Sequence, residues 1–293
     1  MRRFTLVQVD VFTKNRLEGN ALAVVTDATG LTGEEMQGLA KETNLSETTF
    51  VFPRDGATEK SRGARVRIYT VAEELPFAGH PTLGTAFVLR GASGMPEVLL
   101  DLNVGSVPVH YEDTPGQPSF GEMRQRDPEF GARHGAETIA RVTGLSLNEI
   151  DTSVPIESVS TGMSFTIVPL KTLAALQCLR IDLHAGTEYL QKTGGKFFYF
   201  VSRETVNPAA RLHSRMLFYN GEDPATGSAA GCTAAWMAAH GVAAPNERVL
   251  IEQGLEMKRP SQIFVRANLD GSVVNNVRVG GHCVEVMRGE ITL

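Results

Sequence analysis

The stretch Glu74-Leu-Pro-Phe-Ala-Gly-His-Pro-Thr-Leu-Gly-Thr-Ala86 aligns with a second stretch, Glu222-Asp-Pro-Ala-Thr-Gly-Ser-Ala-Ala-Gly-Cys-Thr-Ala234. The offset is 148 residues, the distance from Glu74 to Glu222, and it is close to half of the 293-residue chain. A glutamate, a proline, a glycine, a threonine and an alanine recur at equivalent positions of the two stretches. An internal match at this spacing predicts a duplicated fold with two similar halves.

The flanks of the two stretches are also alike. A strand-like run precedes each copy, Arg65–Tyr69 in the first and Arg215–Tyr219 in the second. An apolar run of small residues follows each copy, Leu83–Leu89 and Ala229–Ala239, and predicts a buried helix. The second run is only about half as long as a membrane span. Each half is therefore predicted to be a sheet around a buried helix.

Strand patterns dominate the rest of the chain, with a few helical patterns between them. Thr32 and Glu35 form a capping-box signature that predicts a helix from Thr32 to Glu42, and Ser146 and Glu149 repeat this signature. The pattern as a whole predicts a mixed α/β or α+β chain. Further helices are expected at Glu137–Val142, with Gly144 as its C′ residue, and around Lys171–Leu179. Strands are expected at Phe4–Phe12, Ala21–Val25, Thr48–Phe52, Phe197–Val201, Arg248–Ile251, Ile263–Arg266 and Val284–Met287.

Composition and charge limit the class of partner. Hydrophobic residues make up 42% of the chain, which excludes disorder, and the length suggests two domains. The net charge of -5 argues against nucleic acid or an anionic membrane as partner and favours a small molecule. Cys178, Cys232 and Cys283 are too scattered for a disulfide framework or a zinc site. Gln8 and Asp10 interrupt any signal-peptide core, so a reduced cytoplasmic location is expected.

The repeated stretches place a glycine where each loop becomes a helix. Free backbone N–H groups at Gly79-His80 and Gly227-Ser228 would suit an anion such as a substrate carboxylate. A simpler interpretation is that the glycines only turn the chain, while Asp223 caps a helix whose first residue is Pro224. Residue patterns alone favour this simpler interpretation.

Other candidate groups carry little signal by themselves. His80 has no neighbouring histidine at metal-ligand spacing, so no metal site is expected. Glu47 ends a helix-to-strand loop, where a carboxylate is ordinarily solvated. No P-loop and no dinucleotide-binding glycine pattern occurs, so no nucleotide cofactor is expected.

Together, however, the motifs resemble those of the phenazine biosynthesis PhzF-like family, relatives of diaminopimelate epimerase. The resemblance runs over nearly the whole chain. Two departures are visible: Ala21 stands where the family commonly has proline, and Lys258 where it has glycine. Neither changes a catalytic position. The matching motifs are Val9-Asp-Val-Phe12, Leu17-Glu-Gly-Asn20, Asn44-Leu-Ser-Glu47, Glu74-Leu-Pro-Phe-Ala-Gly-His-Pro-Thr82, Ser160-Thr-Gly162, Glu222-Asp-Pro-Ala-Thr-Gly-Ser-Ala229, Glu252-Gln-Gly254 and Val279-Gly-Gly281.

The resemblance implies an α+β fold of two pseudo-symmetric halves. Each half is expected to be a mixed, mostly antiparallel, barrel-like sheet around a central helix, with the active site in the cleft between the halves. Residues 1–122 and 279–293 are assigned to the N-terminal half and residues 123–278 to the C-terminal half. The family also implies a homodimer.

The resemblance further implies a cofactor-independent isomerase that acts on a small carboxylated substrate, conjugated or cyclic. The best-known substrate of the family is a dihydro-hydroxyanthranilate. Glu47 is expected to move the proton, with His80, Asp223 and Ser228 also catalytic, and it should be desolvated to act as a base. Expected substrate contacts are Gly79, Thr82, Gly227, Ala229, Asn20 and Gly162.

Two alternatives remain open. The epimerase relatives use two thiols, but the equivalent residues here are His80 and Ser228, with Cys232 one helical turn further on. Two-thiol racemisation is therefore disfavoured, whereas a carboxylate-based amino-acid racemase or epimerase stays possible. A catalytically idle protein that binds a small molecule or another protein is the second alternative. Substrate choice is expected to depend on Thr161–Phe165 and on the segment near Lys258.

Overall fold

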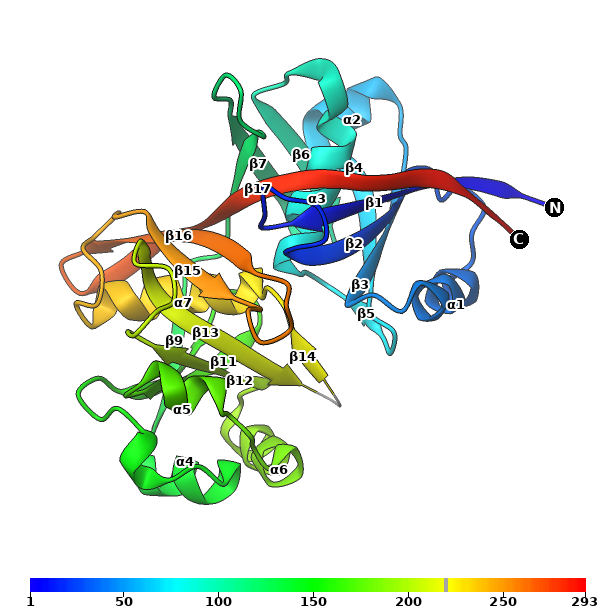
Figure 1. The fold of residues 1–293 in the computed structure, drawn as a ribbon. Coiled ribbons are helices and arrows are strands. Elements are labelled where there is room, and N and C mark those ends of the chain that lie inside the picture. The colour runs from blue at the N-terminus through cyan, green and yellow to red at the C-terminus, as the bar shows by residue number, and fades with distance from the viewer. Residues whose placement is uncertain (219–220) are drawn as a thin grey trace. The chain divides into compact units, whose positions relative to one another are not determined.

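The computed structural model describes residues 1–218 and 221–293 of the chain (Figure 1). Tyr219, the last residue of one expected strand, lies outside these residues. The chain divides into two compact units. The first unit comprises Met1–Arg124 and Gly280–Leu293, and the second comprises Gln125–Val279. No helix within the described ranges is long and apolar enough to cross a bilayer.

Eight strands of the first unit form a closed barrel. Their order is β17, β1, β2, β3, β4, β6, β7 and β8, after which β8 pairs with β17 again. The pairs β2–β3 and β4–β6 are parallel, whereas β17–β1, β1–β2, β3–β4, β6–β7 and β7–β8 are antiparallel. The elements are β1 (Arg3–Val11), β2 (Asn20–Val25), α1 (Gly33–Thr43), β3 (Glu47–Phe52), α2 (Gly56–Arg62), β4 (Ala64–Tyr69), β5 (Glu74–Leu75), α3 (Gly79–Arg90), the 3-10 turn Gly91–Ser93, β6 (Glu97–Leu102), β7 (Gly105–Glu112), β8 (Phe120–Arg124) and β17 (Val273–Thr292).

Helix α3 is the central helix of the first unit and contacts β1, β2, β3, β6 and β8. It packs closely because Gly84 has no side chain. A Cβ atom at Gly84 would lie 2.7 Å from Leu22 and 2.8 Å from Val11. On the outer face, α1 begins with the expected capping box of Thr32 and Glu35 and buries Met36 in a hydrophobic cluster.

The second unit is a curved sheet in the order β9, β10, β11, β12, β13, β15 and β16. The strand β17 follows β16 through the two-residue connection Gly271-Ser272. The elements are β9 (Glu129–His134), α4 (Ala136–Thr143), the 3-10 turn Leu147–Glu149, β10 (Ile156–Ser160), β11 (Ser164–Leu170), α5 (Leu173–Gln177), α6 (Leu183–Thr193), β12 (Phe197–Ser202), β13 (Ala210–Phe218), β14 (Gly221–Asp223), α7 (Gly227–Ala239), β15 (Val249–Gln253) and β16 (Ser261–Asp270).

Helix α7 is the central helix of the second unit. All of its residues from Gly227 to Ala238 are buried, and it packs on β16, β10 and β11. Helices α4, α5 and α6 gather on the outer side of β11 and β12 (Figure 1). Their apolar residues form a second hydrophobic cluster with Ile156, Val168 and Phe200. Each unit therefore has one buried central helix and a separate outer helical layer.

The two units repeat the same topology. The parallel pairs β2–β3 and β4–β6 correspond to β11–β12 and β13–β15, and the hairpin β4–β5 corresponds to β13–β14. One ion pair is duplicated as well: Arg67 binds Glu74 through two hydrogen bonds of 2.8 and 2.6 Å, and Arg215 binds Glu222 through two of 2.8 Å. The prediction of two pseudo-symmetric α+β halves is confirmed.

Three local predictions need correction. Helix α7 begins at Gly227 with Thr226 as its N-cap residue, so Asp223 is not a helix cap and instead ends β14. The capping box of Ser146 and Glu149 exists, but it closes only a 3-10 turn, Leu147–Glu149. The helix expected around Lys171–Leu179 is a short one, Leu173–Gln177.

Candidate active site

In the first unit, three of the expected site residues lie together. Asn20 begins β2 and Glu47 begins the parallel neighbour β3, so both stand at the same end of the sheet. His80 is the second residue of α3. Its Nδ1 atom lies 3.2 Å from Asn20 Nδ2, and its Nε2 atom lies 3.4 Å from Glu47 Oε2. The side chain of Glu47 is only 15% exposed, and that of His80 is 4% exposed.

Burial fixes the protonation state of His80. It lowers the pKa of His80 to about 3, so the ring is neutral at physiological pH. The Asn20 amide nitrogen can only donate, which makes Nδ1 of His80 the acceptor. The ring hydrogen is therefore on Nε2, the atom that lies 3.4 Å from Glu47 Oε2. His80 contacts the Glu47 carboxylate at 3.4 Å and can help to position it, and the neutral ring is unsuited to act as a cationic acid.

We expect the His80 ring to remain in this neutral Nε2-protonated form from pH 5 to pH 8. Long-range proton–nitrogen NMR spectra of the histidine side chains would show one ring with unprotonated Nδ1 and with shifts that do not move over this range. The signal is assigned with a His80→Gln variant. A His80 ring that takes up a second proton above pH 5 would contradict the assignment.

The remaining expected residues of the first unit lie in the first turn of α3. Gly79 is its first residue, and Ala78 is the N-cap, without a side-chain capping bond. Thr82 is fully buried, and its hydroxyl donates to the Ala78 carbonyl at 2.7 Å. The first intrahelical bond comes from the Thr82 N–H. The N–H groups of Gly79 and His80 thus have no partner within the helix.

In the second unit, Asp223 and Ser228 lie at the N-terminal end of α7. Both are buried, with exposed fractions of 7% and 8%. The Thr226 hydroxyl donates to Asp223 Oδ2 at 2.6 Å. The first intrahelical bond comes from the Ala230 N–H, so the N–H groups of Gly227, Ser228 and Ala229 precede the hydrogen-bond ladder of α7. The end of this helix is therefore polar and carries the positive end of the helix dipole.

A residue that the sequence analysis did not place in the site holds this loop. Gln253, the last residue of β15, is fully buried. Its Nε2 donates to the Asp223 carbonyl at 2.7 Å and to Thr226 Oγ1 at 3.0 Å, and its Oε1 accepts from the Thr226 N–H at 3.1 Å. The Tyr199 hydroxyl donates to the same Oε1 at 2.9 Å. The motif Glu252-Gln-Gly254 was the only sequence signal for it.

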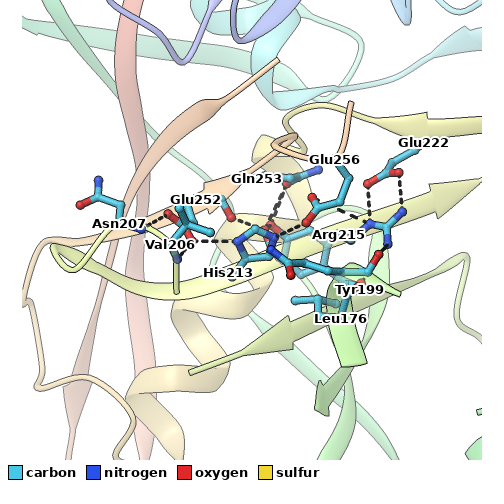
Figure 2. Close-up of polar contacts among 12 residues, drawn as sticks. Leu176, Tyr199, Val206, Asn207, His213, Arg215, Glu222, Glu252, Gln253 and Glu256 are labelled. Atoms are coloured by element: carbon cyan, nitrogen blue, oxygen red, sulfur yellow. Dashed lines mark hydrogen bonds and ion pairs between the residues drawn. The ribbon is translucent and has the colours of Figure 1, made fainter. Parts of the chain in front are cut away.

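A buried ionic cluster adjoins Gln253 (Figure 2). His213 Nδ1 lies 2.7 Å from Glu252 Oε1, and His213 Nε2 lies 3.0 Å from Glu256 Oε1. Burial opposes the charge, but hydrogen bonds to Glu256 and Glu252 outweigh it and raise the pKa of His213. Glu252 also accepts the N–H groups of Val206 and Asn207 at 2.6 and 2.8 Å. The cluster anchors the end of β15 from which Gln253 projects.

The two buried thiols are unsuited to proton transfer. Burial raises the pKa of Cys232 to about 11, and its Sγ lies 3.5 Å from both Thr161 Oγ1 and the Met163 carbonyl. Burial likewise raises the pKa of Cys283 far above its usual range. A thiolate is the reactive form of cysteine, so neither residue is activated. The candidate site is therefore identified by the carboxylates of Glu47 and Asp223 and not by thiols.

The expected site residues therefore divide between the units. Asn20, Glu47 and His80 form one group in the first unit, and Asp223 and Ser228 belong to a second group in the second unit. Gly162 lies in the β10–β11 hairpin with φ of +129°, next to Thr161, whose hydroxyl donates to Gln125 at 2.7 Å. Lys258 is in a turn after Gly254. Both belong to the second unit.

Known proteins of similar sequence fall in one family. The family model for phenazine biosynthesis-like proteins, PhzC-PhzF, matches residues 9–289. An uncharacterized isomerase of Mesorhizobium japonicum is 37% identical, with 96% of each chain covered. The trans-2,3-dihydro-3-hydroxyanthranilate isomerase of Pseudomonas chlororaphis is 35% identical, covering 98% of this chain and 99% of its own. The relatives are thus named as isomerases.

Solved structures agree with this assignment. The Bacillus anthracis phenazine biosynthesis protein of the PhzF family superposes with a TM-score of 0.89 at 26% identity, and all of both chains is covered. A hydroxyproline epimerase from Agrobacterium vitis has a TM-score of 0.65 at 12% identity, covering 99% of this chain and 92% of its own, and so shares the fold alone. The matched family model, the isomerase relatives and the shared fold together show that the chain belongs to the phenazine biosynthesis-like PhzF family.

Proposed function

We propose that the protein is a cofactor-independent isomerase that moves a proton on a small, conjugated carboxylic acid of the dihydro-hydroxyanthranilate class. The observation that carries the proposal is the contact chain from Asn20 through neutral His80 to Glu47. Two relatives, 35% and 33% identical and each covered over 99% of its own length, are named trans-2,3-dihydro-3-hydroxyanthranilate isomerase.

Glu47 is the proposed base. Its side chain is mostly buried at the end of β3, where a carboxylate loses part of its hydration and becomes a better proton acceptor. It takes a proton from a carbon next to the double bond, and the electron pair of that C–H bond enters the conjugated system. The same proton, or one from water, then adds to another carbon. No proton or electron is gained or lost overall, so the step needs no redox cofactor.

The group in the second unit is the proposed partner for the polar parts of the substrate. The N–H groups of Gly227, Ser228 and Ala229 and the positive end of the α7 dipole would bind the substrate carboxylate. Asp223 would accept a hydrogen bond from a substrate hydroxyl or ammonium group. Further proposed substrate contacts are Gly79 and Thr82 at the start of α3 in the first unit, and Gly162 in the β10–β11 hairpin of the second unit.

The test is proton NMR of the purified protein with trans-2,3-dihydro-3-hydroxyanthranilate in heavy water. We expect the signals of the substrate double bond to be replaced by those of a shifted double bond, and no added cofactor should be required. Deuterium entering the original carbon with inversion, without movement of the double bond, would point to a racemase or epimerase instead. Binding without turnover would contradict the proposed activity and favour a binding protein.

A further inference from the structure

The two units of the duplicated fold can be compared residue by residue. Because the two units share strand order and register, each residue around α7 has a counterpart around α3. The register pairs Met216 with Asp223 in the second unit and Ile68 with Leu75 in the first. Leu75 is therefore the counterpart of Asp223. Ala78, the N-cap residue of α3, is the counterpart of Thr226, the N-cap residue of α7.

The counterpart of Gln253 follows from the parallel pair next to the central helix. His213 pairs with Glu252 in β13–β15, and Arg65 pairs with Asp101 in β4–β6. In both pairs a basic residue stands opposite a buried acidic one, since Glu252 is 3% and Asp101 is 5% exposed. The next residue along each strand is Gln253 in the second unit and Leu102 in the first. Leu102 is also buried, with 2% exposure.

In the first unit, the apolar residues Leu75, Ala78 and Leu102 occupy the equivalent positions, and the same turn and helix start form. The second unit has Asp223, Thr226 and Gln253 there, joined by hydrogen bonds. Burying polar groups carries a desolvation penalty that hydrogen bonds only roughly offset, so the fold itself gains little from this exchange. The polar set is present only in the unit that carries Asp223.

The hydrogen bonds run from Gln253 through Thr226 to Asp223, and their direction shows how Gln253 acts on the Asp223 carboxylate. Thr226 Oγ1 accepts from Gln253 Nε2 at 3.0 Å, so its own hydrogen is directed away from Gln253. Two acceptors are in reach, Asp223 Oδ2 at 2.6 Å and Met216 Sδ at 3.2 Å. The carboxylate is the stronger acceptor and the nearer one. Gln253 also holds the Asp223 carbonyl, so both the backbone and the carboxylate of Asp223 are fixed by one amide.

We propose that Gln253 is a positioning residue, which sets the orientation of the Asp223 carboxylate and the start of α7 for substrate. The inference rests on the proposed function, because Asp223 matters only if it contacts substrate. Tyr199 completes the arrangement by donating to Gln253 Oε1, and it lies 2.8 Å from Ser214 Oγ. The counterpart of Tyr199 is Thr49, whose hydroxyl lies 2.8 Å from that of Thr85 in α3.

The test is a Gln253→Leu variant, which places the residue of the first unit into the second. Hydrogen exchange of the Thr226 amide is measured by NMR in parallel with kinetics. We expect roughly tenfold faster exchange, since Gln253 Oε1 accepts this N–H. We expect kcat to fall by about 10- to 100-fold, because a small misplacement of a substrate contact has an effect of that size. The temperature of unfolding should also fall, because leucine leaves the buried Thr226 N–H and Asp223 carbonyl without their partner.

Thr143→Val is the matched control. Thr143 is a fully buried hydroxyl in the same unit that donates only to its own helix, to the Ile139 carbonyl at 2.6 Å. This variant should leave both Thr226 exchange and kcat unchanged. Tyr199→Phe is a second variant for the case that Gln253→Leu does not fold. We expect it to speed Thr226 amide exchange and to lower kcat, each by a smaller factor.

The outcomes separate the two proposals. Unchanged Thr226 exchange in the Gln253→Leu variant would overturn the positioning role, whether or not the protein turns over the substrate. Unchanged kcat in a folded variant with fast exchange would also overturn it. An inactive wild-type protein contradicts the proposed function alone, and Thr226 exchange then still decides whether Gln253 holds the loop.

Discussion

Replacing Glu47 with glutamine is expected to abolish turnover of trans-2,3-dihydro-3-hydroxyanthranilate while leaving the fold intact. The amide has the size of the carboxylate but cannot accept a proton from carbon at neutral pH. Loss of a general base lowers kcat by about 10²- to 10⁴-fold. The measurement is the initial rate by proton NMR or absorbance. Binding of the substrate should change much less than kcat.

Two further variants make the result specific for Glu47. Glu47→Asp keeps a carboxylate on a side chain that is one methylene shorter, so we expect a rate between those of the wild type and Glu47→Gln. Glu42→Gln removes an exposed carboxylate at the end of α1 and should behave as the wild type. A Glu47→Gln enzyme that keeps its rate would eliminate Glu47 as the base and with it the proposed mechanism.

A large loss of stability is expected for Gly254→Ala. Gly254 has φ of +80°, which an L-residue adopts only with strain. A Cβ atom there would lie 2.4 Å from the Arg259 carbonyl oxygen and 2.5 Å from the Pro224 carbonyl oxygen. Backbone atoms cannot move aside as a flexible side chain can. Strain and overpacking together should lower the free energy of unfolding by about 2 to 5 kcal/mol.

Gly271→Ala separates the two causes. Gly271 also has positive φ, at +63°, but a Cβ atom at this position would have no heavy atom of another part of the chain within 4 Å. Only the backbone strain remains, and it should cost about 1 to 2 kcal/mol. Urea or guanidinium unfolding of the two variants gives the comparison. If Gly254→Ala were no less stable than Gly271→Ala, the close approach of Pro224 and Arg259 would not contribute to the loss of stability.

Much of the fold could be predicted from the sequence because the two copies of the repeat share residues at one fixed offset. The offset of Glu74 and Glu222 indicated the two central helices, and the structure adds the duplicated ion pairs of these residues with Arg67 and Arg215. The capping box of Thr32 and Glu35 was equally readable, because its bonds lie within three residues.

Other features depend on contacts that the sequence does not display. Helix α2 (Gly56–Arg62) has no buried residue, so it lacks the apolar periodicity by which a helix is recognised. Gln253 became visible only through its partners, 27 to 54 residues away along the chain. His80 and Glu47 were expected in the site by resemblance, whereas the neutral state of the ring follows from its burial in the structure.

The long strand β17 has a consequence for synthesis of the protein on the ribosome. Its residues up to Val279 belong to the second unit, and those from Gly280 belong to the first, where Cys283 to Thr292 pair with β1 and close the barrel. The first unit is therefore discontinuous, while the second is one uninterrupted segment. During translation the strands of the second unit can pair before the barrel of the first unit closes. Residues 1–124 are made first, but their barrel closes only after residues 280–293 have emerged. Until then β1 keeps an open edge, and an unpaired strand edge favours aggregation.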